Sequence, residues 1–147
     1  MKSRVVLHPT DFSAASRAAF ARAITEARAD GAELLLVHVL STAMPFIGDE
    51  HMSPQIYTEV QRSMQAYGRK QLDELVAKAK AAGARVRGLV LEGTAADAIV
   101  RTARAKRAGV IVMGTHGRSG LGRLLMGSVA QRVVGSASCP VLTVRGK

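Results

Sequence analysis

A near-continuous apolar run, ELLLVHVL at residues 33–40, sets the class of fold that this chain can adopt. Hydrophobic and polar residues do not alternate along it, which is typical of a strand buried on both faces of a parallel sheet. Shorter runs of similar character occur at residues 3–7, 85–91, 110–113 and 141–145. We therefore expect a five-stranded parallel sheet with helices packed on both of its faces.

The segments between these runs carry apolar residues at helical spacing. Helices are expected from Ser13 to Asp30, from Ser53 to about Ala82, from Thr94 to about Ala108 and from Ser128 to near Gly135. Thr94 and Ser128 are each followed, three residues later, by a side chain that can complete a capping box. The alternation of strands and helices predicts a single α/β domain over residues 1–147, with right-handed crossovers.

In such a sheet, ligands bind at the carboxyl ends of the strands. The segments that follow the first, second and fourth predicted strands all leave from that edge. They begin at Pro9, Leu40 and Gly114, respectively. We expect these segments to converge on one binding site.

The segment after the fourth strand is rich in glycine. Five glycines, Gly114, Gly117, Gly120, Gly122 and Gly127, precede Ser128, where a helix is expected to begin. Glycines let a backbone approach a phosphate closely, and a helix N-terminus favours an anion. The segment lacks the lysine of a P-loop and the spacing of a Rossmann fingerprint. It is either a phosphate cradle of another kind or a plain surface connection.

Composition limits the remaining possibilities. The chain is 48% hydrophobic and 22% charged, which is typical of a globular protein, and its formal net charge is +10. No stretch is long and apolar enough to span a membrane, and Cys139 is the single cysteine. We expect a cytoplasmic protein that makes no contact with membranes. The basic surplus lies after Asp97, the last acidic residue, and is compatible with a phosphorylated ligand or with nucleic acid.

Four short motifs resemble those of the ATP-binding universal stress proteins. Gly114 and Gly117, followed after nine residues by Gly127-Ser128, match the glycine motif of that family. The P-T-D at residues 9–11, L-V-H-V at 36–39 and C-P-V-L-T-V at 139–144 resemble its strand motifs. The matches occur in order along the whole chain.

The resemblance implies a three-layer, open parallel sheet of strand order 3-2-1-4-5, of the adenine-nucleotide α-hydrolase-like type, with ATP at its carboxyl edge. It places Asp11 on the ribose, with Pro9 and Thr10 lining the pocket. It places Val39 and Met113 against the adenine. The residues implied to wrap the ribose and phosphates are Gly114, Gly117, Gly127, Ser128 and Val129. The family also implies a homodimer through residues 141–145.

Two further expectations concern the phosphates. On charge alone, we expect Arg118 or Arg123 to bind the outer phosphates, because both lie between the motif glycines. Mg²⁺ or Mn²⁺ could accompany the phosphates, but the spacing of the histidines predicts no metal site in the protein itself. His38 is expected to be a buried, hydrogen-bonded strand residue, and Cys139 to serve packing.

Three functions remain open. The first is a nucleotide-dependent stress-response or regulatory dimer that binds ATP. The second is a slow ATPase or another enzyme that handles adenine nucleotides, although no paired carboxylates and no Ser/His/Asp set accompany the glycine segment. The third is nucleic-acid binding. We rank it last because all five aromatic residues lie outside the basic last third of the chain.

Overall fold

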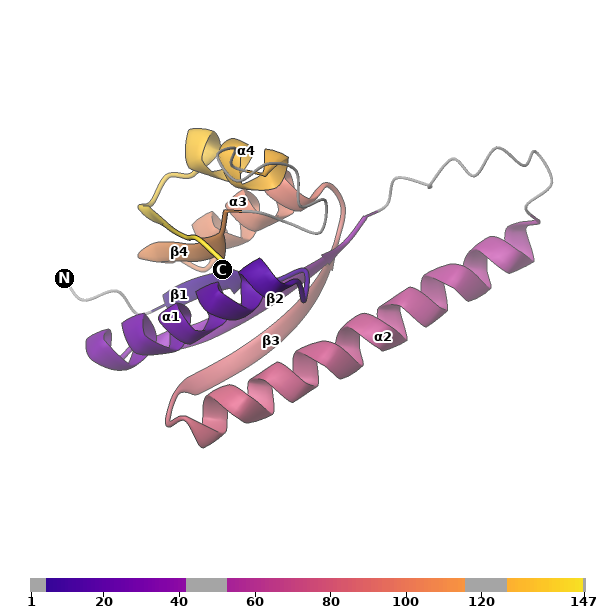
Figure 1. The fold of residues 1–147 in the computed structure, drawn as a ribbon. Coiled ribbons are helices and arrows are strands. Elements are labelled where there is room, and N and C mark those ends of the chain that lie inside the picture. The colour runs from indigo at the N-terminus through magenta and orange to yellow at the C-terminus, as the bar shows by residue number, and fades with distance from the viewer. Residues whose placement is uncertain (1–4, 42–52, 116–126, 147) are drawn as a thin grey trace.

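The computed structural model describes residues 5–41, 53–115 and 127–146 of the chain. In these residues strands and helices alternate, as expected from the sequence (Figure 1). The strands are β1 (Val5–Pro9), β2 (Glu33–Leu40), β3 (Arg85–Glu92), β4 (Val110–Gly114) and β5 (Val141–Val144). The helices are α1 (Ala14–Asp30), α2 (Pro54–Ala81), α3 (Ala95–Ala105) and α4 (Ser128–Ser136).

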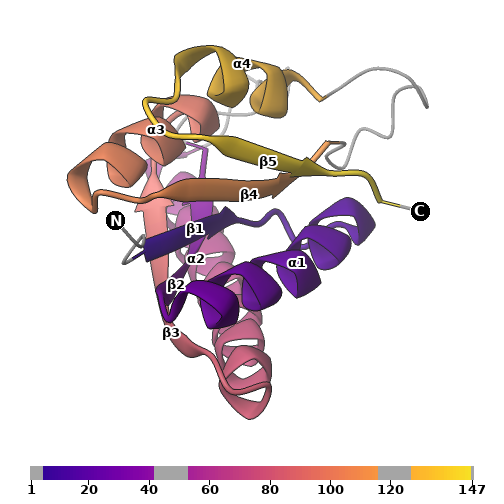
Figure 2. The ribbon, with the colours of Figure 1, turned by 90° about the vertical axis from the view of Figure 1, so that its left-hand side faces the viewer.

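The strands form one parallel sheet of order β3-β2-β1-β4-β5, which confirms the predicted fold. The first strand of the chain therefore lies in the middle, between β2 and β4, and Figure 2 shows β4 and β5 beyond it. In the register, Val6 lies opposite both Leu34 and Val110. This order brings the carboxyl ends of β1, β2 and β4 next to one another.

Helices cover both faces of the sheet, and each face has its own core. On one face, Val6 and Leu36 pack with alanines of α1 and with Leu72 of α2. On the other face, Leu7 and Leu35 pack with residues of α3 and α4. Leu34, Leu35, Leu36 and Val37 of β2 are all fully buried. The continuous hydrophobicity of β2 thus reflects burial on both faces.

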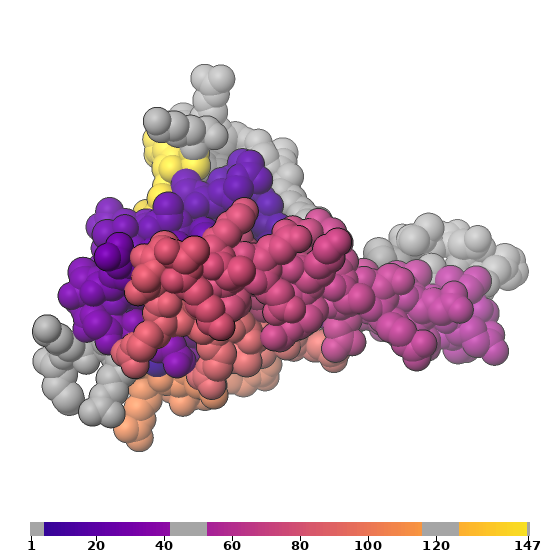
Figure 3. All heavy atoms as spheres, turned by 90° about the horizontal axis from the view of Figure 1, so that it is seen from below, coloured from indigo at the N-terminus to yellow at the C-terminus, as the bar shows by residue number. Residues whose placement is uncertain are grey.

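Helix α2 is much longer than the sheet is wide. It begins at the cap Ser53, whose hydroxyl accepts a hydrogen bond from the Ile56 N–H, and it continues without a break through Gly68. Its C-terminal part packs on β2 and β3, whereas its N-terminal part projects beyond the body of the molecule (Figures 1 and 3). Four large apolar side chains of that part are exposed, namely Ile56, Val60, Met64 and Tyr67.

The capping boxes predicted at the starts of the third and fourth helices are wrong. Thr94 is the N-cap of α3, but its side chain makes no capping hydrogen bond. In α4 the N-cap is Gly127, so Ser128 is the first helical residue and not the cap. Both helices therefore begin without a hydrogen bond from the side chain of their N-cap residue.

Candidate functional site

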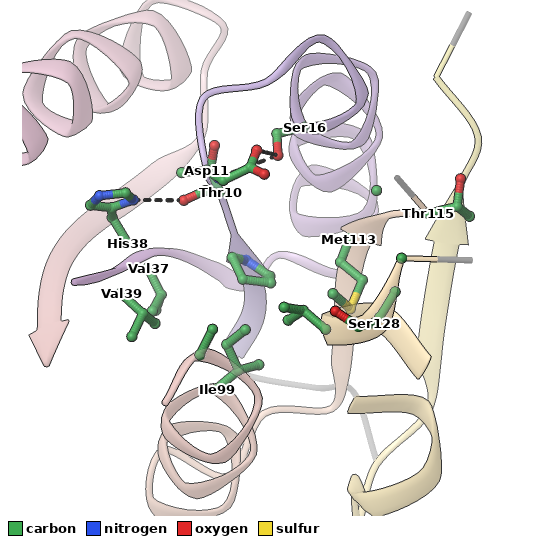
Figure 4. A pocket seen from close by; sticks show the side chains of 16 residues that line it. Thr10, Asp11, Ser16, Val37, His38, Val39, Ile99, Met113, Thr115 and Ser128 are labelled. Carbon is green, nitrogen blue, oxygen red and sulfur yellow. Dashed lines mark hydrogen bonds between the residues drawn. The ribbon is translucent and has the colours of Figure 1, made fainter. Parts of the chain in front are cut away.

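A pocket opens at the carboxyl edge of the sheet, where the ends of β1, β2 and β4 meet the first turns of the helices (Figure 4). It contains about 690 Å³ of space, the solvent at its open mouth included. Nine of the twelve residues expected at the site line it, namely Pro9, Thr10, Asp11, Val39, Met113, Gly114, Gly127, Ser128 and Val129. The other three, Gly117, Arg118 and Arg123, lie outside the described residues.

One side of the pocket is apolar. Val39 from β2, Met113 from β4 and Ile99 from α3 approach it from three different elements (Figure 4). Ile99 is not among the residues expected at the site. The spacing of apolar residues in α3 indicates only that Ile99 faces inward. The packing of α3 against β2 brings Ile99 to the pocket, and local spacing does not encode this tertiary contact. Such a side can take a flat, apolar group such as a nucleobase.

Asp11 provides the carboxylate of the pocket, just before α1. Its Oδ1 accepts a hydrogen bond from the Ser13 N–H, at 2.9 Å. It also accepts one from the Ser16 hydroxyl, at 2.8 Å (Figure 4). Asp11 therefore acts as a helix-start carboxylate and also lines the pocket. Both of these bonds are accepted by the same carboxylate oxygen, Oδ1. Ser16, which helps to fix the orientation of this carboxylate, is not among the residues expected at the site.

His38 joins the second strand to the segment that carries Asp11. Its Nδ1 lies 2.9 Å from the carbonyl oxygen of Thr10, and because a carbonyl can only accept, Nδ1 carries the proton. The Thr10 N–H in turn donates to the carbonyl of Val37, at 2.8 Å. His38 is hydrogen-bonded, as expected, but it is only half-buried and it lines the pocket. The backbone of Thr10 is thereby fixed on both sides.

The two ends of the glycine-rich segment are tied together at the pocket. The Gly127 N–H donates to the carbonyl of Thr115, so this N–H is already engaged within the protein. The first N–H groups of α4 follow at Ser128 and Val129, and the N-cap residue, Gly127, has no side chain to bind them. The positive end of the α4 dipole therefore faces the pocket, where it favours an anion.

Gly114 has a packing role that its place in the motif does not suggest. A Cβ atom at this position would lie 2.9 Å from the backbone oxygen of Ala15 in α1. The absence of a side chain thus lets the end of β4 contact the first turn of α1. Gly114 therefore contributes to the pocket by allowing β4 and α1 to approach each other closely.

His8 and Cys139 are not part of the pocket lining. His8 is fully buried beside Phe20 of α1, and its Nδ1 lies 2.8 Å from the carbonyl oxygen of Val112. Burial lowers the pKa of His8 from 6.5 to about 4, against smaller raising effects of the Val112 carbonyl and of Asp11. Burial raises the pKa of the Cys139 thiol, which packs against the α3–α4 core. The His8 imidazole is therefore neutral, and the Cys139 thiol protonated, at pH 7.

In the part of the chain that the structure describes, no three His, Cys, Asp or Glu side chains gather as a metal site would require. None of the described helices has the length and hydropathy needed to cross a membrane.

Known proteins share both the sequence and the fold. The model of the universal stress protein family matches residues 2–145. Universal stress protein MJ0531 of Methanocaldococcus jannaschii is 37% identical over 141 residues, which cover 95% of this chain and 81% of that protein. The structure of MJ0577, from the same organism, has a TM-score of 0.87 at 23% identity and covers 100% of this chain and 99% of its own.

A universal stress protein crystallised in complex with cAMP is 29% identical, with a TM-score of 0.69 and full coverage of both chains. The match of the family model over nearly the whole chain, together with these relatives, shows that the chain belongs to the universal stress protein family.

Proposed function

We propose that this chain binds ATP in the pocket at the carboxyl edge of the sheet, and that it acts in the cytoplasm as a nucleotide-dependent, stress-response regulatory dimer. The observation that carries the proposal is the composition of the pocket. An apolar side, one oriented carboxylate and the N-terminus of α4 line the same cavity. These are the three kinds of group that a nucleobase, a ribose and a phosphate need.

The adenine would lie against Val39, Ile99 and Met113, and the ribose hydroxyls would donate to Asp11. Hydrogen bonds to a charged acceptor are stronger than those between neutral groups, so Asp11 is the polar group expected to contribute most on the ribose side. The bonds from Ser13 and Ser16 hold this carboxylate in place before a ligand arrives. The relative that was crystallised with cAMP supports an adenine nucleotide as the ligand class.

The phosphates would lie at the start of α4, near the N–H groups of Ser128 and Val129. Because no cluster of acidic side chains among the described residues could hold a metal ion, Mg²⁺ or Mn²⁺ would be carried by the phosphates themselves. Gly117, and Arg118 or Arg123, remain proposed contributors from the segment that precedes α4.

Two observations favour a regulatory role over catalysis. Asp11 and His38 are the two titratable side chains among the described residues that line the pocket. Both already have positional tasks, because Asp11 binds the start of α1 and His38 binds the carbonyl of Thr10. The hydroxyl beside Asp11 is that of Ser16, and the bond between them orients the carboxylate.

Isothermal titration calorimetry with ATP tests the proposal on wild-type protein and on two variants of Asp11. We expect Asp11→Asn to weaken ATP binding by about 1 kcal/mol, because it keeps Oδ1 for Ser13 and Ser16 but removes the charge. Asp11→Ala should cost about 1–3 kcal/mol, because it removes both.

Asp97→Ala is the matched control. Asp97, like Asp11, is a carboxylate near the start of a helix, but it pairs with Arg132 at the surface and does not line the pocket. We expect this variant to bind ATP as wild type does. A wild-type protein that binds no adenine nucleotide would overturn the proposal, and an unchanged affinity in Asp11→Ala would remove Asp11 from the site.

A further inference from the structure

We propose that Phe12 is a positioning residue for Asp11, held by His38 and Tyr67, and that this aromatic cluster couples helix α2 to the nucleotide pocket. The inference rests on the proposed ATP site and deepens it. Phe12 does not line that pocket, so it would act through its neighbour in the chain.

The backbone of Phe12 is the first observation. Its φ is +65°, in the left-handed region that non-glycine residues rarely adopt. The turn that it makes leaves Asp11 in the pocket lining, where its carboxylate accepts from Ser13 and Ser16. The Phe12 N–H donates to the hydroxyl of Thr10, at 3.0 Å, which closes the turn. The orientation of Asp11 therefore depends on a backbone conformation that has to be held in place.

The aromatic contacts are the second observation. The ring of Phe12 lies on the imidazole of His38, with 4.4 Å between the ring centroids, and it meets Tyr67 of α2 edge-on at 6.4 Å. His38 also holds the Thr10 carbonyl through Nδ1 (Figure 4). One imidazole thus contacts both residues that flank Asp11.

The third observation is the absence of a side chain at Gly68, the residue after Tyr67. A Cβ atom there would lie 2.8 Å from Cδ2 of His38, closer than real contacts allow. Because Gly68 has no side chain, the backbone of α2 packs directly against the imidazole of His38. From α2 to Asp11 there is therefore an unbroken chain of contacts through His38 and Phe12, and a movement of the helix at this point would displace the cluster.

A simple turn would not require this arrangement. Glycine adopts a φ of about +65° without strain, so a turn alone would be made more easily by glycine than by phenylalanine. What glycine cannot provide is the ring that contacts His38 and Tyr67. The backbone turn at Phe12 and the contacts of its ring can therefore be tested separately.

The first experiment measures ATP affinity by calorimetry in variants of Phe12. We expect Phe12→Gly to bind at least about tenfold more weakly than wild type, although it relieves the strain, because Asp11 loses its support. Phe12→Tyr keeps the ring and should restore an affinity close to that of wild type. Phe20→Leu is the matched control, because Phe20 packs on the same core from α1 but has its ring beside His8, outside the cluster of Phe12, His38 and Tyr67.

A variant in helix α2 tests the aromatic cluster from the side opposite to Phe12. Gly68→Ala improves the helix propensity of α2, but its methyl group has to displace the His38 ring. We expect weaker ATP binding at unchanged or higher helix content by circular dichroism. This variant also serves if Phe12→Gly fails to fold.

The third experiment detects the coupling itself. The chain contains two tyrosines, so Tyr57→Phe leaves Tyr67 as the single site for fluorotyrosine. Tyr67 does not line the pocket, and we expect its fluorine NMR resonance to shift when ATP binds. The reciprocal effect is required by linkage, because a ligand and a conformation that influence each other do so by the same factor.

The outcomes distinguish this inference from the proposed function. A wild-type protein that binds no ATP would overturn both. If wild type binds ATP, then Phe12→Gly with wild-type affinity would overturn the positioning role, and a Tyr67 resonance unaffected by bound ATP would overturn the coupling. Either result would leave the ATP site intact.

Discussion

His8 is a buried imidazole whose titration links folding to pH. Its folded-state pKa of about 4 lies below the value of 6.5 for an exposed histidine, because burial disfavours the charged form. Between these two values the unfolded chain binds a proton that the folded protein does not. The free energy of unfolding therefore falls as the pH is lowered through this window.

From these two pKa values, we expect His8 to lower the free energy of unfolding by about 3 kcal/mol as the pH falls from 7 to 4. Urea unfolding at several pH values measures it. His8→Gln, which does not titrate, is the reference, and the expected quantity is the difference between the two proteins. A difference that stays constant from pH 7 to pH 4 would mean that His8 is already charged in the fold, or that it is not buried.

The sequence predicted which residues lie at the pocket better than it predicted the contacts that these residues make. Asp11, Val39 and Met113 were named from the resemblance, and all three line the pocket. The bond from Gly127 to Thr115, the role of Ser16 and the contact of Phe12 with His38 were not predicted. They depend on backbone angles and on neighbours far away in the chain, which local spacing does not encode.

Among the elements, the caps of the helices differ in a way that can be measured. Ser13 caps α1, and its hydroxyl accepts a hydrogen bond from the Ser16 N–H at 3.3 Å. Thr94 caps α3 by position only, without such a bond. Both helices pack on the sheet, so a local loss of capping should reduce the stability of the whole domain.

We expect Ser13→Ala to lower the free energy of unfolding by about 1 kcal/mol, because an N–H group at the start of α1 loses its acceptor. Thr94→Ala should lower it by only a few tenths of a kcal/mol, because no bond is lost. Chemical denaturation of wild type and of the two variants measures these losses in the free energy of unfolding. Equal losses would mean that side-chain capping contributes nothing specific to α1.

The positions of the elements were largely predictable, and their ends were not. The predicted helix of residues 53–82 agrees with α2, and the apolar run of residues 33–40 is β2. By contrast, β1 extends through His8 and Pro9, although proline was expected to break it. Pro9 is tolerated because the bond to β2 is donated by the N–H of the next residue, Thr10, so the missing N–H of Pro9 removes no bond to that strand. Helix α3 ends at Ala105, before Arg107 adopts a φ of +53°.

For the molecule as a whole, the apolar runs predicted a parallel sheet but not its strand order. The order 3-2-1-4-5 came from the resemblance, and the structure confirms it. Local pattern cannot provide it, because the position of a strand depends on which helix covers which face. The same order leaves β5 at an edge, paired with β4 in the described residues.

The proposed homodimer through residues 141–145 can be tested at that edge. The Ile111 N–H donates to Pro140 and the Thr115 N–H donates to Val144, so alternate residues of β5 face β4. By this alternation the backbone N–H of Thr143 points away from β4, toward the open edge. Proline at that position removes a donor from the edge but none from the β4–β5 ladder.

We expect Thr143→Pro to convert a dimer into a folded monomer, measured by sedimentation or by light scattering after gel filtration. Leu142→Pro is the control, because its N–H faces β4 and its loss should destabilise the monomer itself. A Thr143→Pro protein that remains dimeric would exclude backbone pairing of β5 as the basis of the dimer.

The central place of β1 has a consequence for how the protein reaches its native state. Strand β1 is synthesised first, yet it is completed by β4, and His8 contacts a carbonyl 104 positions further along the chain. Contacts of such long range form slowly, because much of the chain must be ordered before they can be made. The pocket combines residues 9–11 with residues 127–130, so it exists only when the last third of the chain has docked. A nucleotide bound there would select fully folded molecules and would withdraw them from the unfolding equilibrium.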